Sequence, residues 1–144
     1  MSGARTLLLA SALVLGQVAH AQMTPDAPIQ NFKLPMFNRA GVKVWDLRGD
    51  EAKYLGQDQV DLFKMHLKIF QNDGSGAVRL DIESPHASVL VNEHVVSGPD
   101  SIHVVNPDFE ISGRDYTVRG REQSVTVRSD VHVEFKTKLE DILK

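Results

Sequence analysis

Hydrophobic and polar residues alternate along most of the chain from Met36 onward, which is typical of β-strands with one buried face. The clearest segment runs from Val60 to Phe70. One face of this strand carries Phe63, Met65, Leu67 and Ile69, and the other carries Leu62, Lys64, His66 and Lys68. Full burial of an apolar side chain of this size contributes about 1.5 to 3 kcal/mol, so we expect the Phe63 face to point inward.

One pattern occurs three times: apolar, any, small, any, any, Ala or Tyr, any, apolar. Its copies are Leu47 to Tyr54, Ile82 to Val89 and Ile111 to Val118, with Gly49, Ser84 and Gly113 as the small residues. The small residue and the Ala or Tyr are three positions apart, which reverses the alternation of a strand. A strand restores its buried face there only through a bulge or a sharp bend, here called a corner. The pattern predicts three strands with a corner, as in curved sheets.

The remaining strands are short and closely spaced, which predicts an antiparallel all-β fold. Val42 to Leu47 continues past its corner as Ala52 to Leu55, and the turn residues Asn72 to Gly76 predict a hairpin. Further strands are expected at Val78 to Ile82, Ala87 to Val96, Ser101 to Val105, Phe109 to Ile111, Tyr116 to Arg119, Ser124 to Arg128 and Val131 to Phe135. Gly98-Pro99-Asp100, Asn106-Pro107-Asp108, Gly113, Gly120 and Ser129-Asp130 are expected to separate them.

Both ends of the chain differ from this strand pattern. Residues 1–21 have the form of an export signal, with Arg5, a short apolar run and the small-any-small sequence Ala19-His20-Ala21. The run is too short for an ordinary membrane span, so we expect a cleaved signal and a periplasmic domain, with a signal-anchored inner-membrane form as the alternative. Residues 22–35 are predicted to be a flexible leader, 36–136 one β-domain, and 137–144 a short helical or irregular tail.

Composition narrows the function classes. The chain has no Cys, so the exported domain must be held together by its core without disulfides. It has 16 basic and 19 acidic side chains, and the predicted signal contains one of the basic ones, so the exported chain has a net charge of −4. This charge argues against nucleic acid as a partner.

The sequence predicts no catalytic residue, metal site or cofactor. His66, His103 and His132 alternate with apolar residues on strands, and neither the spacing of a zinc site nor the two-His-plus-Glu set of a metal-binding cupin is visible. Ser97-Gly98 and Ser112-Gly113 lack the elbow sequence of a serine nucleophile. We therefore expect a protein that is not an enzyme, although a glycosidase pair of carboxylates stays open.

Three segments carry a family resemblance: Trp45 to Tyr54, Leu80 to Ala87, and Phe109 to Phe135 with its run of Val125, Val127, Val131 and Val133. Together they resemble the LptC-like and LptA-like (OstA-type) periplasmic proteins of lipopolysaccharide transport, over residues 36–136. The resemblance implies a folded-over β-jellyroll with an apolar groove, in a bridge that passes lipopolysaccharide from an inner-membrane transporter complex to the outer membrane. LptC-like proteins usually keep an N-terminal membrane helix, so the position in the bridge stays open.

Two sets of residues follow as candidates. The groove is expected to bind acyl chains with the inward residues Trp45, Leu47, Phe63, Met65, Leu67, Val78, Leu80, Ile82, Ile102, Val104, Phe109, Ile111, Val125 and Val127. The first and last strands are expected to be open edges that pair with other jellyroll proteins of the bridge, through Val42, Val44, Val131, Val133 and Phe135.

The same sequence patterns allow other interpretations of the fold and function. The apolar faces could fill a closed core without binding anything. An exported carbohydrate-binding or adhesive β-sandwich would need exposed aromatic residues, and Trp45 is the only Trp. A small exported enzyme would need a polar catalytic cluster in the groove. Whether the interior is apolar or polar separates these classes.

Overall fold

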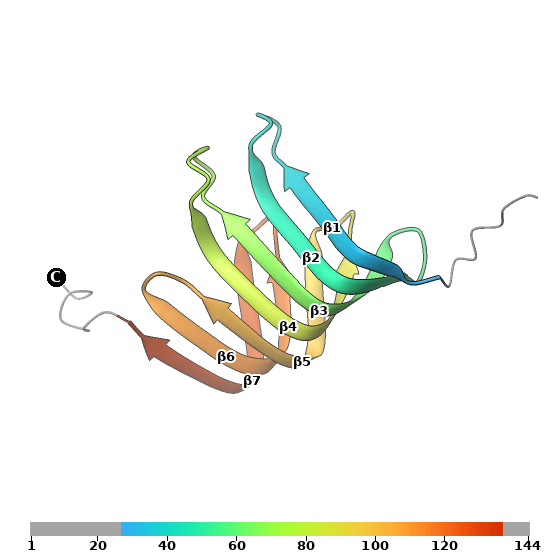
Figure 1. Cartoon of the computed structure of the whole chain (residues 1–144). Helices are drawn as coiled ribbons and strands as arrows, with labels where there is room; N and C mark the ends of the chain where they lie inside the picture. Colours follow the sequence, from blue (N-terminus) through green and yellow to red (C-terminus); the bar gives the residue numbers. More distant parts are fainter. Residues whose placement is uncertain (1–26, 137–144) are drawn as a thin grey trace, which may run out of the picture.

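The structure, a computed structural model, describes residues 27–136. They form seven strands: β1 (Ile29–Phe37), β2 (Lys43–Tyr54), β3 (Gln59–Phe70), β4 (Val78–Leu90), β5 (Val95–Val105), β6 (Phe109–Arg119) and β7 (Ser124–Phe135). All seven belong to one sheet in the order of the chain, and each strand is antiparallel to the next (Figure 1). The predicted all-β fold is confirmed.

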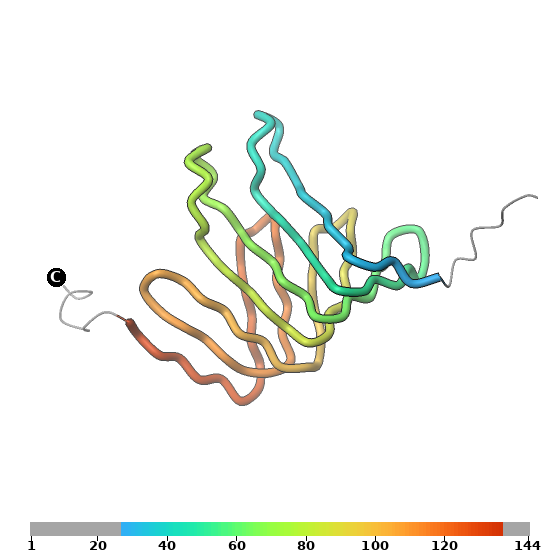
Figure 2. Tube along the Cα trace, viewed as in Figure 1, coloured from blue at the N-terminus to red at the C-terminus, as the bar shows by residue number. Residues whose placement is uncertain are grey.

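The three predicted corners are present. Gly49 and Ala52 on β2 are both buried although they are three positions apart, and Ser84 and Ala87 on β4 repeat this step. Gly113 and Tyr116 do the same on β6. Figure 2 shows that the long strands turn partway along their length, so that the sheet folds over itself. The result is a β-jellyroll with two layers.

The other strands bend at the same level, which the sequence pattern did not predict. Asn31 on β1, Lys64 on β3 and Asp130 on β7 have φ values of 54°, 53° and 52°. On β5 the pairing with β6 shifts between Gly98 and Ser101. Positive φ is uncommon for residues other than Gly, so these residues mark local bulges in the strands.

The two layers pack face to face through one apolar core. Layer A is the half of the sheet on the side of the corners that contains the β2 segment around Trp45, and layer B is the half on the other side, which contains the turn between β4 and β5. The ring of His94 in that turn lies 5.8 Å from the ring of Trp45. Arg79 of layer A also donates a hydrogen bond to Gln123 of layer B. Buried core side chains include Trp45, Leu47, Val60, Leu62, Met65, Leu67, Ile69, Ile82, Val89, Val96, Ile102, Val104, Tyr116 and Val118.

One boundary prediction is wrong. Residues 29–35, expected in a flexible leader, belong to β1, which pairs with β2 along its length. Pro35 obscured this strand in the sequence. Proline lacks a main-chain N–H and is tolerated on an edge strand, where that group would face solvent. Because β1 covers β2, the expectation that Val42 and Val44 form an open edge is also wrong.

Several predicted breaks lie inside strands. Gly98-Pro99-Asp100 is within β5, Gly113 within β6 and Ser129-Asp130 within β7, because these residues bend strands without ending them. In contrast, Ala87 to Val96 is not one strand, because a turn at Val91 to His94 interrupts it. The predicted signal and C-terminal tail lie outside the described residues. Within residues 27–136 the structure has no helix of the length and apolarity that a membrane crossing requires.

Candidate functional site

The predicted groove residues mostly lie between the two layers. Eight of them are buried in the core: Trp45, Leu47, Met65, Leu67, Leu80, Ile82, Ile102 and Val104. Four nearer the β7 edge are only partly buried: Phe109, Ile111, Val125 and Val127. The part of the interior that these residues line is therefore apolar, fully buried at its centre and less buried toward β7.

Two predicted groove residues are placed differently. Phe63 is 43% exposed and stacks on the His86 ring, with ring centroids 5.0 Å apart, on the outer surface of layer B. The corner at Lys64 is the reason, since it adds a residue between the buried Leu62 and Met65 and reverses the alternation. Phe63 as an inward residue is thus wrong. Val78 is exposed at the end of its strand.

A cavity of about 590 Å³ opens where strand ends of the two layers meet. We call it the mouth. Its lining is Met36, Phe37, Asn38, Arg39, Val44, Trp45, Ile69, Asn72, His94, Gly120, Arg121 and Gln123. Apolar side chains from β1, β2 and β3 thus meet polar and basic groups from the turns. Of the predicted groove residues, Trp45 lines it.

Polar and basic groups lie beside the apolar lining of the mouth. The Nε1 of Trp45 is buried and has no hydrogen-bond partner in the described part of the chain. Burial, and secondly the positive charge of Arg121, lower the pKa of His94. Arg121 itself donates a hydrogen bond to the carbonyl of Asn92 at 2.8 Å. The site therefore offers an indole donor and basic side chains beside an apolar interior.

The sheet has two open edges, β1 and β7. On β7 the side chains of Val131, Val133 and Phe135 are 51%, 42% and 52% exposed. The N–H of Lys136 donates to the carbonyl of Asp108 at 2.9 Å, toward β6. Main-chain groups alternate in direction along an antiparallel strand, so the N–H groups of Val133 and Phe135 face the open side. Within the described residues, these two N–H groups have no neighbouring strand to pair with.

The structure also assembles a polar group that the sequence analysis missed. His66 on β3 lies beside Asp81 and Glu83 on β4, and their ligand atoms are all within 4.8 Å of one another. The signal was available, because Asp81 and Glu83 are two apart on one strand face and the predicted hairpin turn places His66 opposite them.

Comparison with known proteins gives one family. The family model described as "Lipopolysaccharide-assembly, LptC-related" matches residues 17–136. No curated protein matches the chain.

Proposed function

Because the chain belongs to the LptC-related lipopolysaccharide-assembly family, we propose that it acts in the periplasm as a non-enzymatic carrier that receives the acyl chains of lipopolysaccharide between its two layers. Family membership supports the role in lipopolysaccharide transport. The observation that carries the finer proposal is the apolar interior, which opens at the mouth and whose side chains are less buried toward the β7 edge.

The packing suggests where the acyl chains bind. Leu47, Leu67 and Ile82 are fully buried and fill the centre. Ile111, Val125 and Val127 are only partly buried, so they can contact a ligand with less rearrangement. Apolar contact is non-directional, which lets a carrier pass a lipid along without a chemical step.

We further propose that the domain joins other jellyroll proteins of the transport bridge through its sheet edges. Pairing along β7 would place the interiors of two domains side by side, with main-chain hydrogen bonds between the edge strands. The β7 edge carries three exposed apolar side chains and one acidic residue, Glu134, between Val131 and Phe135. Pro35 and Lys33 protect the β1 edge better against unselective pairing.

The carbohydrate-binding alternative receives little support. Its recognition would need a platform of exposed aromatic side chains. The only Trp of the chain is buried between the layers with 3% of its surface exposed, and the exposed aromatic residues of the described part, Phe37, Tyr54, Phe63 and Phe135, belong to four different strands.

Photo-crosslinking tests the cargo. A photoreactive residue at Ile111 or Val127 should capture lipopolysaccharide in cells that export it, because both side chains are partly buried against the core near the β7 edge. The matched control is Phe63, which is large and apolar but lies on the outer surface. Equal capture from Phe63 and Ile111 would contradict a groove and indicate nonspecific adhesion to lipid.

A further inference from the structure

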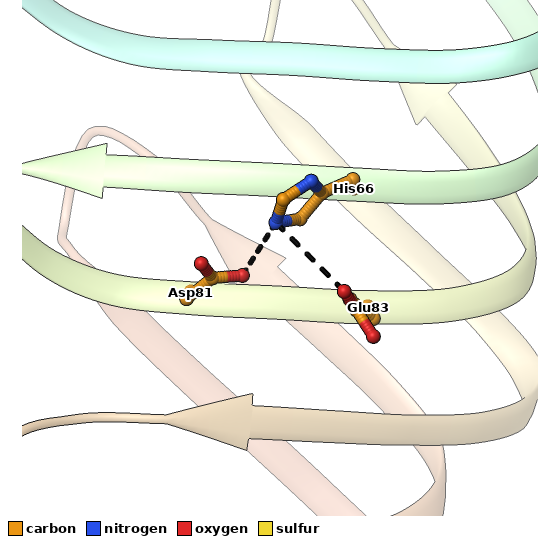
Figure 3. A group of neighbouring side chains, drawn as sticks. All are labelled: His66, Asp81 and Glu83. Carbon is orange, nitrogen blue, oxygen red and sulfur yellow. Dashed lines mark hydrogen bonds and ion pairs between the residues drawn. The ribbon is translucent and has the colours of Figure 1, made fainter.

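The group formed by His66, Asp81 and Glu83 lies on the outer face of layer A, away from the apolar interior. In the register of the sheet, His66 is opposite Glu83, and Asp81 is the next residue on the same face of β4. The Nε2 of His66 is 2.5 Å from Oδ1 of Asp81 and 4.0 Å from Oε1 of Glu83. Figure 3 shows one ring nitrogen directed between the two carboxylates. Three potential ligands therefore converge from two paired strands.

We propose that His66, Asp81 and Glu83 form a site for a divalent transition metal, with Zn²⁺ as the best match. One imidazole nitrogen and two carboxylate oxygens are a donor set that zinc accepts at about 2.0 to 2.2 Å. The imidazole disfavours Mg²⁺ and Ca²⁺, which prefer oxygen ligands. This proposal is independent of lipid transport, since none of the three residues lines the mouth.

The supporting strands are rigid at this point. Leu67 follows His66 and Ile82 separates the two carboxylates, and both of these apolar side chains are completely buried in the core. The main chain that holds the three ligands is thereby fixed. Glu83 has the most exposed side chain of the three, at 65%, so it can rotate the short distance needed to close the site.

The charge balance also favours a cation. In the described part of the chain, neither Asp81 nor Glu83 forms an ion pair with Lys or Arg, although Lys68 lies opposite Asp81 in the sheet. Arg48, which lies opposite His66 on β2, is instead paired with Asp46 at 3.1 Å. Two neighbouring carboxylates without a Lys or Arg partner repel each other, and a bound cation would remove that repulsion.

A metal here would stay accessible. His66 and Glu83 line a hollow of about 570 Å³ beside the corners, together with His103 of β5. His103 is opposite Glu83 in the sheet and lies 3.4 Å from Glu110. Three protein ligands leave a coordination position for water or another anionic or imidazole donor.

The chain contains a good control for this geometry. His86 also has two acidic neighbours, but Asp61 lies 3.8 Å from its Nε2 and Asp100 lies 3.6 Å from its Nδ1. The two carboxylates thus face opposite nitrogens of one ring. They cannot converge on one ion with the imidazole, so His86 should not bind a metal.

The test is Zn²⁺ titration of the full, untagged chain after chelator treatment, followed by calorimetry, with Co²⁺ absorption as a report on coordination. Untagged protein is needed because a polyhistidine tag binds the same ions. We expect one ion whose binding is lost in His66→Gln, Asp81→Asn and Glu83→Gln, each by at least about tenfold in affinity, and unchanged in His86→Gln. Excess Mg²⁺ should not displace it.

A second readout separates binding from misfolding. Zn²⁺ should raise the melting temperature of the unsubstituted chain and of His86→Gln, because a ligand of the native state stabilises it, but not that of Asp81→Asn. Circular dichroism establishes that each variant is folded. Absence of Zn²⁺ and Co²⁺ uptake by the unsubstituted chain, or full uptake by a folded variant lacking all three side chains, would overturn the proposal.

Discussion

The hydroxyl of Tyr116 on β6 donates a hydrogen bond to the main-chain carbonyl of His86 on β4, at 3.0 Å. The intervening strand β5 passes closely at Gly98, where an added Cβ would lie 3.1 Å from that carbonyl and 3.3 Å from the hydroxyl. The hydroxyl of Ser84 lies 3.0 Å from the same carbonyl and 2.7 Å from the carbonyl of Ser101 on β5, so its one hydrogen is shared between the two acceptors. The corners of β4, β5 and β6 therefore meet at one carbonyl oxygen. Burial of the Tyr116 hydroxyl at this point raises its pKa.

Tyr116→Phe removes one of these hydrogen bonds and leaves the ring in place. We expect a loss of about 1 kcal/mol in the free energy of unfolding, because a hydrogen bond between a neutral hydroxyl and a carbonyl typically contributes this much. Urea denaturation measures it. Tyr54→Phe is the control, since Tyr54 is an exposed residue of β2, and an equal loss there would contradict a special role for the corner.

Gly113→Ala tests the corner of β6. An alanine Cβ at this position would overlap Val127 and lie 2.9 Å from the carbonyl oxygen of Ser129. We expect a loss of about 1 to 3 kcal/mol, because main chain and a packed side chain must both move. The matched control is Gly56→Ala, where nothing lies within 4 Å of the added carbon. Thermal unfolding of the two variants should differ clearly, and indistinguishable midpoints would contradict the tight fit.

The pKa of His94 responds to two causes that can be separated. Arg121→Gln should raise this pKa only in part, because burial is the larger cause and remains. High salt should act similarly, since it screens the charge but not the burial. Titration of the ring resonances by NMR measures the shift. A fall of the His94 pKa in Arg121→Gln would contradict the assignment.

The lowered pKa of His94 also determines how the stability of the fold changes with pH. At a pH below the usual histidine pKa of about 6.5, His94 binds a proton more readily in the unfolded chain than in the folded one. Acid therefore favours unfolding. His94 therefore contributes a loss of stability as the pH falls through that value. His94→Asn should reduce the loss between neutral and acid pH, as measured by denaturation at each pH.

Trp45 provides a direct signal for ligand entry. It is the only Trp of the chain and lines the mouth. Lipopolysaccharide should change its fluorescence intensity and wavelength, because acyl chains that enter the mouth change the packing around the indole. The polysaccharide without its acylated part should not. An equal response to both would show that sugar, rather than lipid, occupies the mouth.

Sequence reasoning located features that depend on local patterns. The small residues Gly49, Ser84 and Gly113 marked corners because their spacing reverses the strand alternation. The corner at Lys64 had no such mark, since Lys adopts positive φ there only under the constraint of neighbouring strands. This single residue turned Phe63 outward.

The site depended even more on tertiary structure. The alternation of apolar and polar residues was enough to predict that Trp45 and Leu47 are buried. The mouth could not be predicted in this way, because it depends on which turns of the two layers meet. The open edge at Val42 was assigned from chain order, and Pro35 hid the strand that covers it. The grouping of His66 with Asp81 and Glu83 depends on the register between β3 and β4. A slip of one residue would place His66 on the opposite face of the sheet from the two carboxylates.

The edge of β7 gives the last prediction. Val133→Pro removes an N–H that faces the open side of the sheet, so the isolated fold should keep its stability while binding to a partner jellyroll domain is lost. Glu134→Pro is the counterpart, because the N–H of Glu134 faces β6, as that of Lys136 does, and its removal should destabilise the fold. Val133→Ala shortens the side chain but retains the N–H donor, so its affinity for the partner domain should be closer to that of the unsubstituted chain than the affinity of Val133→Pro is. Denaturation and a binding titration with the partner domain measure both effects. Unchanged affinity in Val133→Pro would exclude strand pairing at this edge, since main-chain hydrogen bonds supply most of the affinity of such a contact.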